Sequence, residues 1–247
     1  MNGQSINAEL KYLAELIEDF PPKKKISAED AFKELKVRYE TLESFADGFI
    51  DFLLSLPETK VAELFPTLGK IDDNFPYGMM LFMGIAHKYL FADILNNAGQ
   101  FRLISDPHNG KVYYGGLSKR EIGKYKFFGS NPEKIVDDLN NAFLFLKKKS
   151  KEPIKSGLEF YRRFVRIHPF YEANGRVARL ILTIYLQYHG YYIVWREINE
   201  KHNGKFLSKL NSCHTHEGKA TYEKYFGYFA DFFEPFIKPI TELKKMK

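Results

Sequence analysis

The spacing of apolar side chains predicts that the chain begins with two helices. Apolar residues recur with helical periodicity over residues 6–19, and Pro21-Pro22 ends this segment because proline cannot continue the hydrogen-bond ladder. Ser27, three positions before Asp30, is typical of a helix N-cap. A long amphipathic helix is expected to follow and to run to about residue 55.

A third long helix is predicted from Tyr77 to about Asn97, closed by Gly99. Turn-forming residues cluster just before it, so we place a soft boundary near residues 70–78. The stretch after this helix differs, because short aromatic and β-branched runs alternate with glycines there. This pattern favours a β-hairpin within residues 111–128.

Helical periodicity returns over residues 132–148 and 153–167, and Pro169 stops the second of these helices. A further helix is expected to start at Asn174 or Gly175. Its apolar residues form one core stripe at positions i, i+3, i+4, i+7, i+8 and i+11, namely Val177, Leu180, Ile181, Ile184, Tyr185 and Tyr188. The loop between these two helices is therefore expected to be held still from both sides.

These segments together predict a mainly α fold, a helical bundle with one short β-hairpin. We expect an N-terminal helical extension over residues 1–74, a core domain over residues 75–235 and a C-terminal tail over residues 236–247. A chain of 247 residues is long enough for such a core with an extension. The hydrophobic content of 45% and the aromatic content of 16% are sufficient for a packed interior.

Composition and charge narrow the classes of function. A net charge of +6 would fit a nucleic-acid partner, but the lysine runs stand beside prolines, at a helix end and at the C-terminus, which is typical of solvated surface. Nucleic-acid binding is therefore not favoured. The most apolar long stretch, residues 79–95, contains charged side chains and is too polar to span a membrane. A single cysteine and the lack of a secretory signal favour a cytoplasmic protein.

One short segment, residues 167–179, gathers most of the candidate chemistry. It contains His168, whose ordinary pKa suits a general base near neutral pH. Ala173, Asn174 and Gly175 lack bulky side chains, so a phosphate oxygen could approach the backbone amides at the start of the next helix. This junction is therefore a candidate anion site.

Charged side chains complete the set. Arg176 and Arg179 project from the first turn of the helix away from the core stripe, and guanidinium groups are well suited to phosphate. Glu172 is an odd neighbour for an anion, and a divalent cation would explain it by bridging carboxylate and phosphate oxygens. Each residue taken alone could be an ordinary capping or surface residue. At this spacing, between two core helices, they predict a nucleotide site with a metal ion.

The segment from His168 to Arg179 resembles the signature of the Fic family, His-Pro-Phe-x-(Asp/Glu)-Gly-Asn-(Gly/Lys)-Arg-x-x-Arg. Similar family segments outside this signature are found at residues 87–91, 98–102, 131–135 and 219–233. The resemblance therefore covers roughly residues 75–235. It implies a Fic-type helical bundle in which the β-hairpin is the flap of the active site.

The resemblance also implies a protein adenylyltransferase, which transfers AMP from ATP to a Ser, Thr or Tyr hydroxyl of a target protein. His168 would take the proton of that hydroxyl, and Glu172 would ligate Mg²⁺. Asn174 and Gly175 would line the anion hole, and Arg179 would reach the γ-phosphate. The residues implied in nucleotide binding are Ala173, Asn174, Gly175, Arg176 and Arg179. The target protein would dock on the flap, near residues 111–128, as an added strand.

Ala173 and Gly175 bear on the type of reaction. Ala173 stands where most of the family has glycine, and its methyl group is accommodated if the residue keeps a negative φ. Doc-type members, which act as kinases, are similar to this chain in having alanine there. Those relatives have lysine at the position of Gly175, so Gly175 favours AMP transfer over phosphorylation.

Regulation is not decided by the resemblance. Many family members carry an inhibitory (Ser/Thr)-x-x-x-Glu-(Gly/Asn) helix whose glutamate pairs with the second signature arginine. The nearest matches in this chain, residues 5–10, 59–64 and 213–218, are each incomplete. Inhibition by a small partner protein, inhibition by a diverged element and no inhibition stay open as alternatives, and so does a homodimer.

Other functions stay open as well. The same site could transfer another nucleotide or a phosphoryl group, or remove AMP by hydrolysis. Alternatively, the fold could be catalytically silent and serve as an interaction module that recruits partners through residues 1–70.

Overall fold

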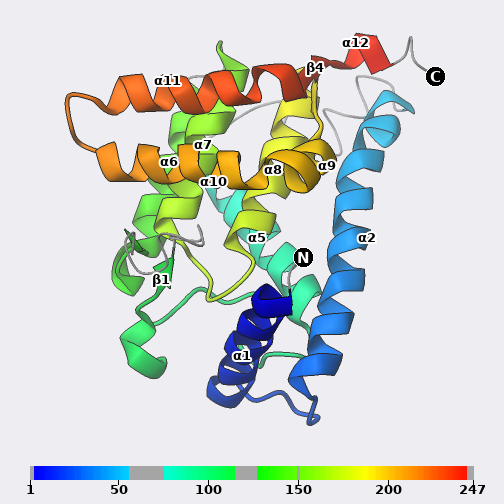
Figure 1. The fold of residues 1–247 in the computed structure, drawn as a ribbon, viewed down its shortest axis with the longest axis vertical. Helices are drawn as coiled ribbons and strands as arrows, with labels where there is room; N and C mark the ends of the chain where they lie inside the picture. Colours follow the sequence, from blue (N-terminus) through cyan, green and yellow to red (C-terminus); the bar gives the residue numbers. More distant parts are fainter. Residues whose placement is uncertain (1–2, 56–74, 115–126, 149–150, 244–247) are drawn as a thin grey trace.

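The computed structural model describes residues 3–55, 75–114, 127–148 and 151–243 (Figure 1). The longer elements are α1 (Gly3–Asp19), α2 (Ala28–Ser55), α5 (Phe75–Phe91), α6 (Ile135–Lys148), α7 (Pro153–Ile167), α8 (Asn174–Tyr188), α10 (Asn203–His216) and α11 (Tyr222–Phe233). The strands are β1 (Tyr113–Tyr114), β2 (Phe127–Phe128), β3 (Tyr191–Ile193) and β4 (Ile237–Pro239). The short helical segments are η1 (Pro107–Gly110), η2 (Pro132–Lys134), α9 (Trp195–Glu197), η3 (Ile198–His202), η4 (Glu234–Phe236) and α12 (Ile240–Leu243).

The prediction of a mainly α fold with a short hairpin is confirmed. α7 and α8 pack against each other, α6 covers α7, and α2 lies along α8. α10 and α11 run side by side across one end of the bundle (Figure 1). The division into residues 1–74, 75–235 and 236–247 stays a prediction, since most of the expected boundary near residues 70–78 lies outside the described ranges.

The two N-terminal helices begin and end close to their predicted bounds. The side chain of Ser27 accepts a hydrogen bond from the backbone N–H of Asp30 at 3.1 Å, so the predicted N-cap of α2 is confirmed. Further along α2, the Arg38 guanidinium donates to the carbonyls of Leu90 and Ala92 at 3.0 and 2.6 Å. A cation at the C-terminal carbonyls of α5 satisfies acceptors that the helix itself leaves open, so α2 is fastened to α5.

α5 ends earlier than the sequence pattern predicts. The helix stops at Phe91 and not near Asn97, because Asp93 takes a left-handed conformation with φ 65° and the chain turns back. The backbone N–H of Gly99 then donates to Nδ1 of His87 at 2.9 Å. Gly99 has φ 85°, a conformation that other residues rarely adopt, and a Cβ on it would lie 2.9 Å from the carbonyl oxygen of Gly84. Both the backbone conformation and the close packing therefore require glycine at this position.

α8 begins at Asn174, as predicted, but it is buried on nearly all sides and not only along one stripe. Residues 177, 178 and 180–187 are all buried. Among them Thr183 is 2% exposed, and its hydroxyl accepts a hydrogen bond from the Trp195 indole at 2.8 Å. The face opposite the apolar stripe is therefore covered by α9, and the helix that carries the signature arginines is central to the core.

Two antiparallel strand pairs complete the fold. β1 and β2 pair Tyr113 with Phe128 and Tyr114 with Phe127, which confirms the predicted hairpin at its base. Residues 115–126 between them lie outside the described residues. The second pair, β3 with β4, was not predicted, and it joins the end of α8 to residues 237–239. No helix within the described ranges combines the length and apolar character that a membrane crossing needs.

Candidate active site

The candidate base His168 lies directly after the last turn of α7. Its backbone has φ 54° and ψ 60°, the left-handed region, and its N–H donates to the carbonyl of Phe164 at 3.0 Å. A residue in this region commonly ends a helix, but it is usually glycine. A histidine in this conformation carries a steric cost of roughly 1–2 kcal/mol, so the surrounding contacts must hold it there.

The imidazole of His168 is held by the flap and by its own helix. The Tyr114 ring stacks on it with ring centroids 4.4 Å apart. Its Nδ1 lies 3.2 Å from the carbonyl oxygen of Val165. Because a carbonyl can only accept, Nδ1 carries the proton and Nε2 is left as the basic nitrogen. Burial lowers the pKa of His168 to about 4, so the neutral, basic form prevails at neutral pH.

Arg102 fixes the backbone around His168. This side chain is 1% exposed, and its backbone N–H donates to the carbonyl of Pro169 at 3.1 Å. Its Nε donates to the carbonyl of His168 at 2.8 Å. Its other nitrogens donate to the carbonyls of Gly110, Ser130 and Ile167. One buried guanidinium therefore joins the candidate loop, the base of the flap and the turn at η1.

The middle of the loop is anchored in the core by Phe170. Its ring is fully buried and stacks on the His87 ring, with centroids 4.0 Å apart and an angle of 12° between the planes. The side chain of Asn174 accepts from the N–H of Phe170 at 2.9 Å and donates to its carbonyl at 2.8 Å. The Asn174 side chain is thus committed to the shape of the loop.

Tyr171 connects the loop to the N-terminal helix α1. The Tyr12 hydroxyl donates to the Tyr171 carbonyl at 2.7 Å, and the ring centroids of Phe20 and Tyr171 lie 4.7 Å apart. The Tyr171 hydroxyl donates to Asp106 at 3.0 Å. The loop is therefore held on its outer side by residues far away in the sequence.

Ala173 does not have the expected negative φ. It has φ 59° and ψ 12°, and it is 4% exposed. The chain therefore places an alanine in a conformation that glycine adopts without strain. Gly175, which follows in the first turn of α8, has a different environment. A Cβ built on it would come no closer than 4.0 Å to the Tyr161 hydroxyl, so protein packing does not require glycine there.

Glu172 and Arg176 lie together at the start of α8. Nη1 of Arg176 is 3.3 Å from Oε1 of Glu172, and their side chains are 42% and 31% exposed. A partly exposed carboxylate with one oxygen outside this pair fits Mg²⁺, which commonly binds one or two protein carboxylates, phosphate oxygens and water. Within the described residues no group of three or more His, Cys, Asp and Glu side chains surrounds a common point. A metal ion here would therefore depend on Glu172 and on the nucleotide.

Arg179, the second signature arginine, is oriented by residues that follow α8. Its Nη1 donates to the Asn199 side chain at 2.7 Å, and its guanidinium carbon lies 5.0 Å from the centroid of the Trp195 ring. Arg176 and Arg179 both line a pocket of about 550 Å³ between α2, α8 and α9. The predicted position of both arginines on one side of α8 is therefore observed, and that side faces a pocket.

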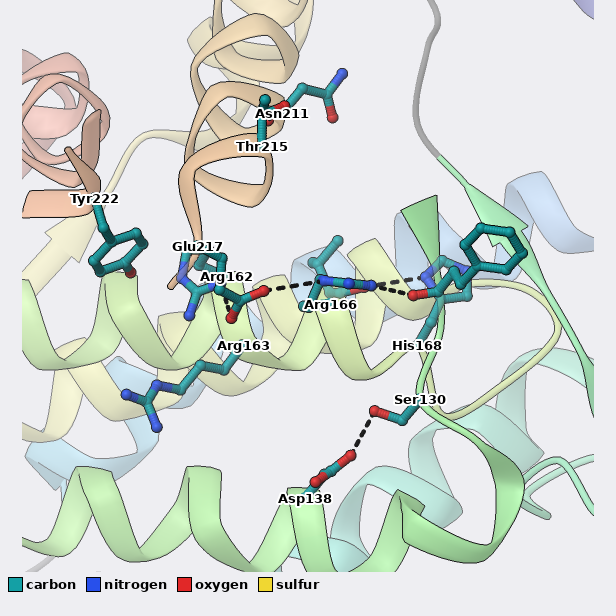
Figure 2. Close-up of polar contacts among 12 residues, drawn as sticks. Ser130, Asp138, Arg162, Arg163, Arg166, His168, Asn211, Thr215, Glu217 and Tyr222 are labelled. Carbon is teal, nitrogen blue, oxygen red and sulfur yellow. Dashed lines mark hydrogen bonds and ion pairs between the residues drawn. The ribbon is translucent and has the colours of Figure 1, made fainter. Parts of the chain in front are cut away.

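A network of ion pairs lies along α7 on the other side of His168 (Figure 2). The Arg162 guanidinium, 3% exposed, donates to Glu159 at 2.9 and 3.0 Å and to Glu217 at 2.9 Å. Arg166 pairs with Glu217 at 3.1 Å and donates to the carbonyl of Phe128 at the end of β2. Burial opposes the charge of Glu159, but hydrogen bonds from Arg162 and its neighbours lower the pKa of this carboxyl.

Glu217 belongs to one of the incomplete inhibitory motifs, residues 213–218, and its position shows which arginines this motif contacts. The carboxylate pairs with Arg162 and Arg166 and not with Arg179 (Figure 2). The segment 213–218 therefore does not reach the second signature arginine. The segment 59–64 lies outside the described residues.

Arg102, Tyr114 and Tyr39 were not identified as site residues from the sequence. Arg102 belongs to a segment that resembles the family, but its sequence context does not reveal that it binds four backbone carbonyls. Tyr114 was part of the predicted hairpin, and only the fold brings its ring onto His168. Tyr39 lies in α2, more than a hundred residues from the signature, and its ring lies against Arg176. Periodicity cannot reveal contacts of this range.

Comparisons with known proteins agree with this arrangement. Residues 83–186 match the model of the Fic/DOC family. A probable protein adenylyltransferase of Sinorhizobium fredii, y4lH, is 29% identical over 113 residues, which are 42% of this chain and 50% of that protein. The chain thus covers about half the length of this relative.

A solved structure supports the fold. The N-terminal Fic domain of a Bartonella effector protein, a substrate of the VirB T4SS from Bartonella sp. AR 15-3, superposes with a TM-score of 0.56. The superposition covers 90% of this chain and 92% of that one at 14% sequence identity. At this identity the similarity is evidence of a common fold alone.

Proposed function

We propose that this chain, whose residues 83–186 match the model of the Fic/DOC family, transfers AMP from ATP to a hydroxyl side chain of a target protein. The family match and the adenylyltransferase name of the curated relative support a transferase. The finer assignment, adenylyl transfer to Ser, Thr or Tyr, is the proposal.

The observation that carries the proposal is the state of His168. Its Nδ1–H is committed to the Val165 carbonyl, and burial keeps the imidazole neutral at physiological pH. Nε2 is therefore unprotonated and can take a proton during the reaction, as a weaker base than a free imidazole, and it is held a few residues before a helix N-terminus that carries two arginines. This combination suits the activation of a hydroxyl beside a bound phosphate.

In the proposed reaction Nε2 of His168 accepts the proton of the target hydroxyl as its oxygen forms a bond to the α-phosphorus of ATP. The bond between the α-phosphorus and the bridging oxygen breaks, and pyrophosphate leaves. The Arg102 contacts hold the His168 backbone during this step, so the base need not reorganise.

The remaining signature residues would bind and orient the nucleotide. The backbone amides of Ala173, Asn174 and Gly175 lie at the N-terminus of α8, where unpaired N–H groups and the helix dipole favour phosphate oxygens. Arg176 and Arg179 would bind the β- and γ-phosphates through charge-assisted hydrogen bonds.

Glu172 would hold Mg²⁺ through its carboxylate. When bound, the ion would neutralise phosphate charge and stabilise the leaving pyrophosphate. A target segment would dock at the flap, near residues 111–128, of which residues 111–114 and 127–128 belong to the described residues.

The experiment is intact-mass analysis of the purified protein, and of lysate proteins, after incubation with Mg²⁺ and ATP labelled at either the α- or the γ-phosphate. Adenylyl transfer predicts a mass gain equal to one AMP moiety and retention of the α-label. Transfer of the γ-label alone would instead identify a kinase.

His168→Asn is the matched control, because asparagine tolerates the left-handed conformation but offers no base. Transfer should fall by at least about 100-fold while nucleotide binding stays within about twofold. Equal transfer by His168→Asn and the wild type would remove His168 from the mechanism.

A further inference from the structure

The N-terminal helix α2 contributes an aromatic ring to the candidate nucleotide site. The guanidinium carbon of Arg176 lies 3.5 Å from the centroid of the Tyr39 ring. Tyr39 and Arg176 line the same pocket between α2 and α8. Burial raises the pKa of the Tyr39 hydroxyl above its ordinary range, so the phenol stays neutral. The contact is therefore a cation–π stack between two separate parts of the chain.

This stacking leaves the hydrogen-bonding groups of Arg176 available. A guanidinium is planar, and its five N–H donors lie at the edge of the plane, whereas the Tyr39 ring covers the face. Within the described residues one of these donors, on Nη1, pairs with Glu172 at 3.3 Å. The other donors can meet an anion without breaking the stack.

The stack also restricts the Arg176 side chain. An arginine at the surface has several rotatable bonds and loses conformational freedom when it binds a ligand. Tyr39 on one face and Glu172 at one edge hold the guanidinium before any ligand arrives. The second arginine, Arg179, is held similarly by Trp195 and Asn199.

We propose that Tyr39 is a positioning residue of the nucleotide site, which holds the Arg176 guanidinium ready for a nucleotide phosphate. The inference rests on the proposed function, because it requires that Arg176 binds phosphate. It also means that the helices before residue 56 form part of the site, as the contacts of Tyr12 and Phe20 with Tyr171 also indicate.

The test is calorimetric titration of the full chain with Mg²⁺ and a non-hydrolysable ATP analogue. Tyr39→Phe keeps the ring and should bind within about twofold of the wild type. Tyr39→Leu removes the ring and should bind about three- to tenfold more weakly, the factor expected for losing one preorganised side chain. Arg176→Gln should bind at least as weakly as Tyr39→Leu.

Leu35→Ala is the control for packing. Leu35 is 5% exposed, one helical turn before Tyr39, and its truncation loosens α2 in the core without removing the aromatic ring. Measured at a temperature where thermal unfolding shows every variant folded, Leu35→Ala should bind as the wild type. Equal weakening by Leu35→Ala and Tyr39→Leu would show a packing effect and overturn the proposal.

Two further outcomes separate this inference from the proposed function. Wild-type affinity in Tyr39→Leu together with weak binding by Arg176→Gln would reject the role of Tyr39 and leave the proposed function standing. Wild-type affinity in Arg176→Gln, or no binding by the wild type, would reject the phosphate role of Arg176, and the inference would fall with it.

Discussion

Acid should destabilise this protein well above the pH at which its carboxylates titrate. Burial lowers the pKa of His87 to about 3 and that of His168 to about 4, from an ordinary value of 6.5. His214 is 5% exposed, and burial lowers its pKa as well. In each case the folded protein keeps a neutral imidazole that the unfolded chain would protonate first.

This difference in proton binding determines the direction in which stability changes with pH. Below about pH 6.5 the unfolded state binds more protons than the folded state, so stability falls as the pH falls toward the folded-state pKa values. At pH 5 each of His87 and His168 contributes about 2 kcal/mol less stability than at neutral pH. The two together remove about 4 kcal/mol from a total that is typically 5–15 kcal/mol, and His214 acts in the same direction.

Urea unfolding at pH 7.5, 6.5, 5.5 and 5.0 measures this loss. The variant His214→Phe should flatten the slope by about 1.4 kcal/mol per pH unit, because one protonation site leaves a pocket lined by the Tyr114 and Phe127 rings. A free energy of unfolding that changes by less than about 1 kcal/mol between pH 7.5 and 5.0 would refute the reasoning.

Three further substitutions test the loop and its supports, each by urea unfolding at pH 7.5. Ala173→Gly should raise stability by up to about 1 kcal/mol, because relief of the left-handed strain outweighs the added entropy of the unfolded chain; a clear loss would contradict the strain. Arg102→Met should lower the free energy of unfolding by about 3 kcal/mol or more, because the backbone carbonyls that accept from Arg102 would lose their hydrogen-bond donor. A loss below about 1 kcal/mol would show that water replaces the guanidinium as the donor. Glu159→Gln should cost about 3 kcal/mol, because the buried Arg162 loses its main carboxylate partner, and an unchanged midpoint would mean that Glu217 suffices.

The sequence alone determined the helical framework and the place of the candidate site. The start of α8 at Asn174, the stop of α7 before Pro169 and the N-cap at Ser27 depend on local rules, which act over one or two helical turns. The hairpin within residues 111–128 was predictable for a similar reason, because hairpin partners are close in the chain, whereas the register of Tyr114 with Phe127 came from the structure.

The conformation of the site was decided by tertiary structure. α5 ends at Phe91 because Asp93 turns left-handed and Gly99 returns to His87, a contact that no periodicity contains. Ala173 takes a positive φ, against the expectation of a negative one, since Phe170 must enter the core and Asn174 must close the loop behind it.

The same holds for the orientation of the charged groups. The sequence determined which residues are the candidates for the chemistry, since His168, Glu172 and Arg176 stand within one short segment. Tertiary packing decided which rings lie against His168 and Arg176, because Tyr114 and Tyr39 approach them only in the folded chain. Local spacing determines which groups can meet a ligand, whereas burial and long-range contacts determine their charge state and direction.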